Sequence, residues 1–329
     1  MAIVTVFNHK GGVGKTTVAF NLGLMLGELQ NKVLLVDLDP QANLTALALD
    51  EQRFESLYTR DEAWTIAAAF RPLVSGSGDY EAREPVKIRD NVYLIPGDIR
   101  LAEFESLLPV SWTESLAGQE RGFRITSAIY RLLKEASSSK ECRYTICDVG
   151  PNIGALNRAI ITSTDYLIVP VSSDLFSLRA IDTVGQSIVL WHNEWLRARQ
   201  GVPRSLPFEI PHGSPRFLGY IIQQFGIYGG RPASAYRHWH DRLEPAIQEG
   251  ITAPLGAVGL VEVGDATDLK LADIQNFHSL APNAQRNHKA IFELDATEAL
   301  GQHQYTVSKA REIYQHLATK VMSRTQAGP

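Results

Sequence analysis

A glycine-rich loop near the amino terminus carries residues suited to binding phosphate. Residues 8–17 read Asn-His-Lys-Gly-Gly-Val-Gly-Lys-Thr-Thr, directly after an apolar run and just before a helical pattern. In that setting glycines let backbone N–H groups approach phosphate oxygens, and the helix N-terminus adds the positive end of its dipole. The general pattern G-x-x-x-x-G-K-[ST] is missed only at its first glycine, where His9 stands. The loop predicts a phosphate site, against the alternative of a purely structural glycine turn.

Carboxylates follow two apolar runs farther along the chain. Residues 33–36 lead into Asp37 and Asp39, and residues 144–147 lead into Asp148. Carboxylates are costly in a core, but they suit a site that holds a metal ion and a water. For Asp37 a structural and a functional role are equally good interpretations, and Asp148 has the alternative of capping the next helix.

These groups need a scaffold that brings strand ends together. Continuous apolar runs alternate with helical patterns along the chain, at residues 3–7, 33–36, 92–95, 144–147, 166–171 and 217–222. Continuous runs are typical of strands covered on both faces. The alternation predicts an α/β fold with a doubly wound, mostly parallel sheet flanked by helices, and a ligand at the carboxyl ends of the strands.

A single domain is predicted for residues 1–329, with elaborations around residues 50–124 and 191–216. The apolar pattern loosens in the first elaboration, and closely spaced prolines exclude a continuous helix at residues 197–215. Residues 306–321 place apolar side chains at helical spacing and predict a closing helix. The polar face of this helix is mixed in sign, which favours core packing over a membrane anchor.

The composition is that of a folded globular protein, with 329 residues, of which 44% are hydrophobic and 21% charged. A formal net charge of -4 lacks the excess of a basic nucleic-acid binder, although a local patch stays possible. No apolar run approaches the ~18 residues of a membrane span, and the first residues do not form a signal peptide. Two cysteines, Cys142 and Cys147, support neither a disulfide framework nor a metal site. We therefore expect a cytoplasmic protein.

The loop and the acidic strand ends together resemble one family. Residues 10–17, Lys-Gly-Gly-Val-Gly-Lys-Thr-Thr, resemble the deviant Walker A loop of the ParA/MinD family of P-loop ATPases. Residues 33–43 resemble its switch I, and residues 144–151 resemble its Walker B strand and switch II, with Val-Gly-Pro in place of the frequent x-Pro-Pro after the aspartate. Further matches follow in order at residues 92–101, 165–173 and 217–225, so that the resemblance covers most of the chain.

The resemblance implies Mg²⁺ and ATP as ligands. Lys15 would contact the β- and γ-phosphates, the Thr16 hydroxyl would ligate Mg²⁺, and Thr17 would contact the α-phosphate. Lys10 would reach the nucleotide of a second subunit in a sandwich dimer. The remaining loop positions in the implied ATP site are Gly11, Gly12, Val13 and Gly14.

Three further roles are implied outside the loop. Asp39 would orient the attacking water, and Asp148 would hold Mg²⁺ through water, so that both aspartates belong to the expected metal site together with Thr16. Gln223 follows a predicted strand, where the family often uses an asparagine that contacts adenine.

The function implied by the resemblance is DNA partition or cargo positioning. ATP would close a homodimer, the dimer would bind DNA without sequence preference and associate with the nucleoid, and a ParB-like or other adaptor protein would stimulate hydrolysis. The candidate DNA contacts are Arg286, Lys289, Lys309 and Arg311. Two alternatives stay open: an ATP-dependent ligase or amidotransferase-type enzyme on the same fold, and a MinD-like membrane-positioning ATPase. No membrane contact is expected, because the tail lacks a basic amphipathic helix.

Overall fold

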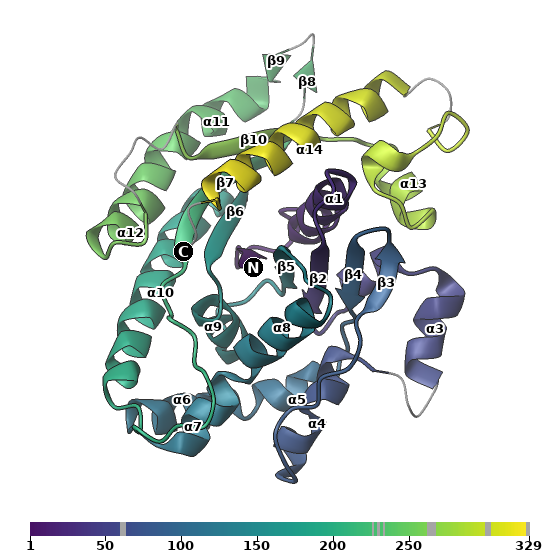
Figure 1. Ribbon diagram of the computed structural model, residues 1–329. Helices are drawn as coiled ribbons and strands as arrows, with labels where there is room; N and C mark the ends of the chain where they lie inside the picture. Colours follow the sequence, from purple (N-terminus) through teal and green to yellow (C-terminus); the bar gives the residue numbers. More distant parts are fainter. Residues whose placement is uncertain are drawn as a thin grey trace.

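The computed structural model describes residues 1–59, 64–225, 227–228, 231–232, 234–261, 268–299 and 304–326. Its centre is an eight-stranded sheet with the strand order β10-β7-β6-β1-β5-β2-β4-β3 (Figure 1). The strands are β1 (Ala2–Val6), β2 (Val33–Leu38), β3 (Val86–Arg89), β4 (Val92–Ile95), β5 (Tyr144–Val149), β6 (Tyr166–Ser172), β7 (Arg216–Phe225) and β10 (Lys270–Gln275). Neighbours in this sheet run parallel except β3 and β4. The predicted doubly wound, mostly parallel α/β sheet is confirmed.

The central strands are apolar on both sides because helices cover both faces of the sheet. In β1 successive residues belong to different cores, Ile3 to one face and Val4 to the other, as the alternation of side chains along a strand requires. The core that includes Val4 is closed by α1 (Lys15–Glu28), α2 (Asn43–Ala48), α13 (Leu280–Arg286) and α14 (Gln304–Arg324). The core that includes Ile3 is closed by α4 (Ile66–Ser75), α5 (Leu101–Glu105), α8 (Ala128–Ser139), α9 (Ala155–Thr162), α10 (Leu175–Gln200), α11 (Ser234–Ile247) and α12 (Ala253–Ala257).

The first elaboration contains short helices around β3 and β4. Besides α4 and α5 these are α3 (Glu51–Thr59), α6 (Leu108–Leu116) and α7 (Glu120–Thr126). Helices α6 and α7 pack on the second half of α10 through a small aromatic cluster of Trp112, Phe123 and Trp195. The second elaboration starts inside α10, which continues to Gln200, and its proline-rich segment then folds back on Trp195, whose Nε1 donates to the Pro211 carbonyl at 2.9 Å.

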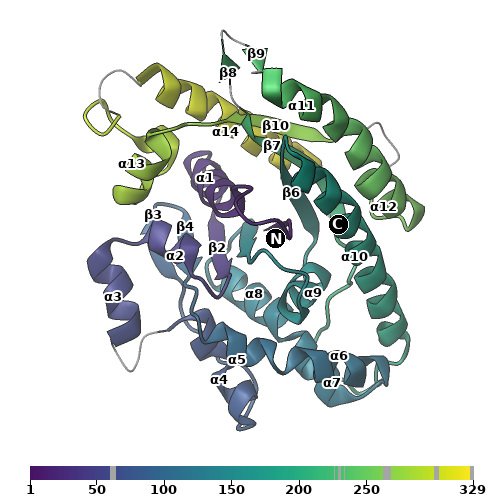
Figure 2. The ribbon, with the colours of Figure 1, turned by 180° about the vertical axis from the view of Figure 1, so that it is seen from behind.

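The last part of the chain covers the first helix. Figures 1 and 2 show α14 lying alongside α1, and the two helices share one apolar core. The backbone N–H of Ile291, in the 3-10 turn η2 (Ile291–Glu293), donates to the Asn21 side chain on α1 at 2.9 Å. The α1 helix is thus fixed by residues some 270 positions later in the chain.

Several local features complete the fold. A π-helical turn, η1 (Gln248–Thr252), joins α11 to α12, and β8 (Ile227–Tyr228) pairs with β9 (Arg231–Pro232) in a small second sheet. Helix α1 begins at Lys15, earlier than the apolar pattern indicates, and the predicted closing helix is α14. In the described part of the chain, no helix combines the length and the apolar character needed to cross a bilayer.

Candidate functional site

The loop between β1 and α1 has the backbone geometry of a phosphate cradle. Gly12 and Gly14 adopt left-handed conformations, with φ of 73° and 75°, which glycine reaches without strain. Gly14 is the N-cap of α1, and no side chain caps the first turn. Because no side chain caps this turn, the N–H groups at the start of α1 can donate to phosphate oxygens.

The Lys15 side chain is a buried cation at the base of the loop. Its Nζ donates to the Lys10 carbonyl at 3.2 Å. Burial lowers the pKa of Lys15, while the carboxylates of Asp148 and Asp39 act in the opposite direction. An anionic ligand would stabilise the charged form of a partly desolvated ammonium group at the base of a glycine loop.

Two carboxylates lie side by side at the ends of the central strands. Strands β2 and β5 pair in parallel with Asp37 opposite Asp148, and both side chains are fully buried. No hydrogen bond of standard geometry reaches either carboxylate oxygen of Asp148, although the Thr16 side chain lies near enough to act against the rise of its pKa. Burial, followed by the nearby charge of Asp37, raises the pKa of Asp148 to about 8. A buried carboxylate without partners, beside the loop that carries Thr16, fits a divalent cation such as Mg²⁺, which commonly takes one or two carboxylates plus phosphate oxygens.

This unpartnered carboxylate should weaken the ligand-free protein in a pH-dependent way. Because the pKa of Asp148 is raised from 3.8 to about 8, the folded state disfavours ionisation, and stability is lost as the pH rises between these values. Asp148→Asn is expected to stabilise the ligand-free protein at pH 8 by an amount on the order of a few kcal/mol, and less at pH 5. Thermal melts at the two pH values measure this difference. Asp90→Asn, which changes an exposed carboxylate, is the control; a lower melting temperature of Asp148→Asn than of the wild type at pH 8 would refute the expectation.

Asp39 lies where the two switch segments meet. Its side chain is almost buried, and Oδ1 accepts the Gln41 N–H at 3.0 Å. A Cβ atom added to Gly150 of switch II would lie 3.2 Å from the same Oδ1, so glycine allows the close approach of the two segments. Asp39 and Asp148 both act on the charge of Lys15, which places the three predicted groups within one electrostatic site.

Lys10 has partners that the sequence analysis did not name. Its Nζ donates to the carboxylate of Asp174 and to Ser177 Oγ, the latter at 3.1 Å. Asp174 is also the N-cap of α10, since its carboxylate accepts the Ser177 N–H at 3.0 Å. The position of Asp174 before a helical pattern could have predicted its role as an N-cap. Its contact with Lys10 could not be predicted, because the two residues are 164 positions apart.

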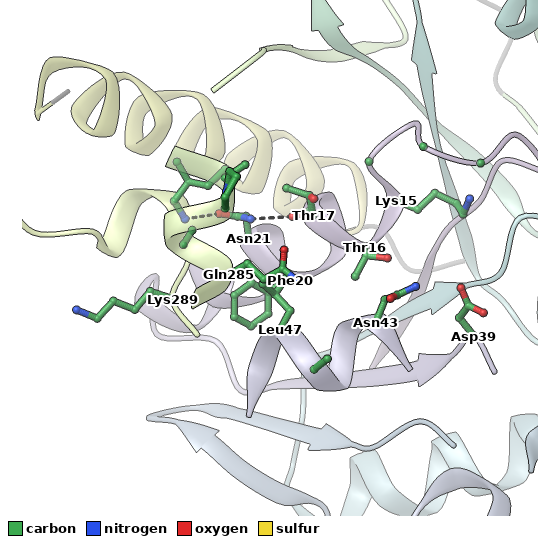
Figure 3. A pocket seen from close by; sticks show the side chains of 18 of the residues that line it. Lys15, Thr16, Thr17, Phe20, Asn21, Asp39, Asn43, Leu47, Gln285 and Lys289 are labelled. Atoms are coloured by element: carbon green, nitrogen blue, oxygen red, sulfur yellow. Dashed lines mark hydrogen bonds between the residues drawn. The ribbon is translucent and has the colours of Figure 1, made fainter. Parts of the chain in front are cut away.

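A cavity of about 490 Å³ extends from the phosphate loop along α1. Figure 3 shows Lys15, Thr16 and Asp39 together at one end and Lys289 at the other. Between these ends the cavity is lined by residues of α1, α2 and α13, among them Phe20, Asn21, Leu47, Pro282 and Gln285. The contribution of α13 was not predicted, because nothing in its local sequence links it to the loop.

Gln223, at the end of β7, also reaches the phosphate loop. Its Nε2 donates to the Gly14 carbonyl at 3.4 Å, and the side chain is almost completely buried. A Cβ atom on Gly14 would lie 2.9 Å from it. The structure thus brings Gln223 to the loop, while its contact with adenine stays a prediction.

The four basic candidates for DNA contact differ in their surroundings. Lys289 forms an ion pair with Glu298 at 2.6 Å, and Arg311 pairs with Glu28 and also donates to the Phe292 carbonyl. Arg286 is exposed and Lys309 is half-buried. Ion-paired cations have less charge to offer to phosphate, so the proposed patch depends mainly on Arg286 and Lys309.

The fold and this site define the class of protein. A parallel sheet with a glycine loop between its first strand and first helix, a lysine at the helix start and acidic residues at adjoining strand ends is a P-loop nucleotide-binding protein.

Comparison with known proteins identifies the family. A family model described as an AAA domain matches residues 1–198, more than half of the 329 residues. The chain belongs to this family, within the ParA/MinD group of P-loop ATPases. It is 26% identical over 189 residues to the sporulation initiation inhibitor protein Soj of Bacillus subtilis, covering 57% of this chain and 65% of Soj. It is 29% identical over 194 residues to the chromosome partitioning protein ParA of Caulobacter vibrioides, covering 57% of this chain and 62% of that protein.

Solved structures extend the similarity of the fold to the whole chain. The structure of protein DIP2308 from Corynebacterium diphtheriae covers 99% of both chains with a TM-score of 0.73 and 24% identity. A Cyanothece McdA variant in complex with ATP covers 98% of this chain and 96% of its own, with a TM-score of 0.64 and 17% identity. At these sequence identities the similarity to the solved structures supports the fold alone. The matches to Soj and ParA span less than two thirds of the length of those proteins.

Proposed function

We propose that this protein is a Mg²⁺-dependent ATPase of the partition type, which dimerises with ATP, binds DNA without sequence preference and positions DNA or other cargo. The observation that carries the proposal is the cradle itself: left-handed glycines, an uncapped α1 N-terminus and a buried Lys15 beside the unpartnered Asp148. The partition role is supported by the similarity to ParA of Caulobacter vibrioides, which is named a chromosome partitioning protein. The protein would be cytoplasmic, associated with the nucleoid when ATP is bound, and stimulated by a ParB-like or other adaptor.

Some residues of the site would bind the nucleotide and the metal ion, and Asp39 would also take part in hydrolysis. Residues 10–17 would bind the phosphates, with Lys15 on the β- and γ-phosphates and Thr17 on the α-phosphate. Thr16, Asp39 and Asp148 would hold Mg²⁺, which supplies charge neutralisation on the phosphates when it is bound. Asp39 would also orient the attacking water, and Gln223 would contact the adenine. Catalysis of this kind consists mainly of positioning and electrostatic stabilisation.

Lys10 must change partners to act across a dimer. In the single chain it is held by Asp174 and Ser177 at the start of α10. Reaching the nucleotide of a second subunit requires this ion pair to break, and the phosphate charge of the second site would replace the lost carboxylate. The exposed side chains of Leu175 and Phe176 next to Asp174 offer apolar surface for the same subunit contact.

The proposal is tested by co-sedimentation with DNA in the presence of Mg-ATP, Mg-ADP or no nucleotide, together with ATP turnover. We expect DNA binding only with ATP, and slow turnover that requires no small-molecule acceptor. Turnover that depends on an added small acceptor would instead indicate a ligase or amidotransferase-type enzyme. Failure of the ATP-bound protein to bind DNA in low salt would reject the partition role.

The DNA-binding surface can be tested with charge-matched variants. Arg286→Ala/Lys309→Ala and Lys289→Ala/Arg311→Ala remove the same charge, but among the described residues only the second pair is held in ion pairs. We expect the first variant to weaken DNA binding and to reduce the log-log salt slope by roughly 0.9 per lost phosphate contact, and the second to change the slope less. Equal slopes for the two variants would reject this surface. Turnover without DNA should be unchanged in the first variant, because Arg286 and Lys309 lie outside the phosphate loop, the switches and the lining of the cavity, which includes Lys289.

A further inference from the structure

The switch I loop is tied at both ends to one buried carboxylate. Asp37 Oδ2 accepts the backbone N–H of Thr45 at 2.8 Å and the Thr45 hydroxyl at 2.6 Å. Asp37 Oδ1 accepts the backbone N–H of Asp39 at 3.3 Å. Because Asp37 belongs to β2 and Thr45 to α2, the residues between them form a loop whose two ends meet at a single side chain.

This closed loop is also fixed to a different strand. The Thr45 hydroxyl, which donates to Asp37, accepts the backbone N–H of Gly97 at 2.7 Å, just beyond the end of β4. Gly97 approaches Asp37 so closely that a Cβ atom at position 97 would lie 2.7 Å from Asp37 Cγ. We call Asp37, Thr45 and Gly97 the switch I anchor. All three residues are buried.

The segment inside the anchor is under conformational strain. Ala42, the residue before α2, has a left-handed backbone with φ of 53°, which costs a non-glycine residue about 1 kcal/mol or more. Its N–H donates to the Asp39 carbonyl at 2.9 Å, and the Gln41 N–H donates to Asp39 Oδ1 at 3.0 Å. A strained turn persists only when its surroundings determine it, and here the anchor supplies that constraint.

We propose that Thr45, through Asp37 and Gly97, is a positioning residue for ATP hydrolysis, which holds the switch I turn so that Asp39 faces the attacking water. The proposal rests on the proposed function for the role of Asp39. None of the three anchor residues lines the cavity that extends from the phosphate loop. Loss of the Thr45 hydroxyl should therefore lower kcat and leave ATP affinity nearly unchanged, because a displacement of about 1 Å at a reacting group can cost roughly 100-fold in rate.

The substitutions separate the hydroxyl from the shape of the side chain. Thr45→Val keeps the volume but can neither donate to Asp37 nor accept from Gly97, whereas Thr45→Ser keeps both hydrogen bonds. We expect kcat to fall roughly 10- to 100-fold in Thr45→Val with a KM for ATP within about 3-fold of the wild type, and Thr45→Ser to stay within about 3-fold in both. Thr126→Val is the matched control, since Thr126 is also buried and loses hydrogen bonds outside switch I, at 2.8 Å to the Gly122 carbonyl of its own helix and at 3.1 Å to Ser115 Oγ of α6.

A second measurement does not depend on ATPase activity. Hydrogen exchange without nucleotide should be several-fold faster in Thr45→Val for the N–H groups of Asp39, Ala42 and Gly97, and unchanged in Thr45→Ser. Faster exchange with a normal kcat would overturn the positioning role. Normal exchange in Thr45→Val would overturn the anchor itself, and a wild-type protein without turnover would count against the proposed function alone. If Thr45→Val does not fold, Thr45→Cys replaces it, because a thiol is only a weak donor and acceptor; equal kcat for the cysteine and serine variants would then reject the proposal.

Discussion

Replacing Lys15 with alanine is expected to abolish ATP binding within the range that calorimetry can measure. The side chain is the buried cation at the base of the phosphate cradle, and it acts on phosphates through charge-assisted hydrogen bonds in a partly desolvated site. Loss of such an interaction should reduce affinity by about 100-fold or more, which corresponds to about 2.7 kcal/mol. Titration of the folded variant with Mg-ATP measures the change.

The surroundings of Lys15 also predict that the ligand-free Lys15→Ala variant stays folded. Because burial lowers the pKa of Lys15, its removal should not destabilise the ligand-free protein, and the melting temperature of the variant should equal or exceed that of the wild type. Lys87→Ala is the control, since Lys87 lies on the surface and pairs with Asp90. ATP affinity equal to that of the wild type in Lys15→Ala would reject the loop as the phosphate site.

Replacing Asp39 with alanine is expected to preserve ATP binding and to slow hydrolysis by about 100-fold or more. Its carboxylate is proposed to orient the water and to hold Mg²⁺ together with Thr16 and Asp148, which stay in place, while the phosphate cradle is formed by other residues. The switch I anchor does not use the Asp39 side chain, so the loop should keep its ends in place. The variant should therefore accumulate as an ATP-bound dimer, visible by size-exclusion chromatography with light scattering.

Two outcomes would contradict this role for Asp39. One is a monomer under saturating Mg-ATP, which would show that the side chain is needed for binding or assembly. The other is turnover at the wild-type rate, which would assign the water to another group. Asp90→Ala, on an exposed carboxylate with a side chain that is 95% exposed, is the control for a change in charge alone.

The site was predictable where the residues that act together are adjacent in sequence or end neighbouring strands. The loop at residues 10–17 is one continuous segment. Asp39 directly follows β2 and Asp148 lies near the end of β5, and these strands pair in parallel, so their proximity followed from the fold class. The partners of these groups were not predictable. Thr45 meets Gly97 52 positions away, and Glu298 and Glu28 neutralise cations that the sequence analysis had assigned to a DNA patch.

Two strands of the sheet also could not be predicted from the sequence pattern. The six strands predicted from continuous apolar runs are present, but β3 and β10 were missed because both are edge strands. β3 reads Val-Lys-Ile-Arg and β10 reads Lys-Leu-Ala-Asp-Ile-Gln, and each mixes polar with apolar residues. An edge strand has a neighbour on one side only, so its sequence need not be apolar throughout. These two segments join the sheet through tertiary pairing, which their local sequence patterns do not indicate.

Because α1 packs against α14, α1 can reach its final packing only after the ribosome has synthesised α14. The Asn31 side chain, just after α1, meets Met322 of α14 across 291 positions. At about 5 to 20 residues per second, roughly 15 to 60 seconds of synthesis separate the two partners. Until α14 emerges, the outer apolar side of α1 has no permanent cover, although the phosphate loop at its start is already complete in sequence. We therefore expect the apolar side of α1 that packs against α14 to stay accessible to chaperones until α14 has been synthesised.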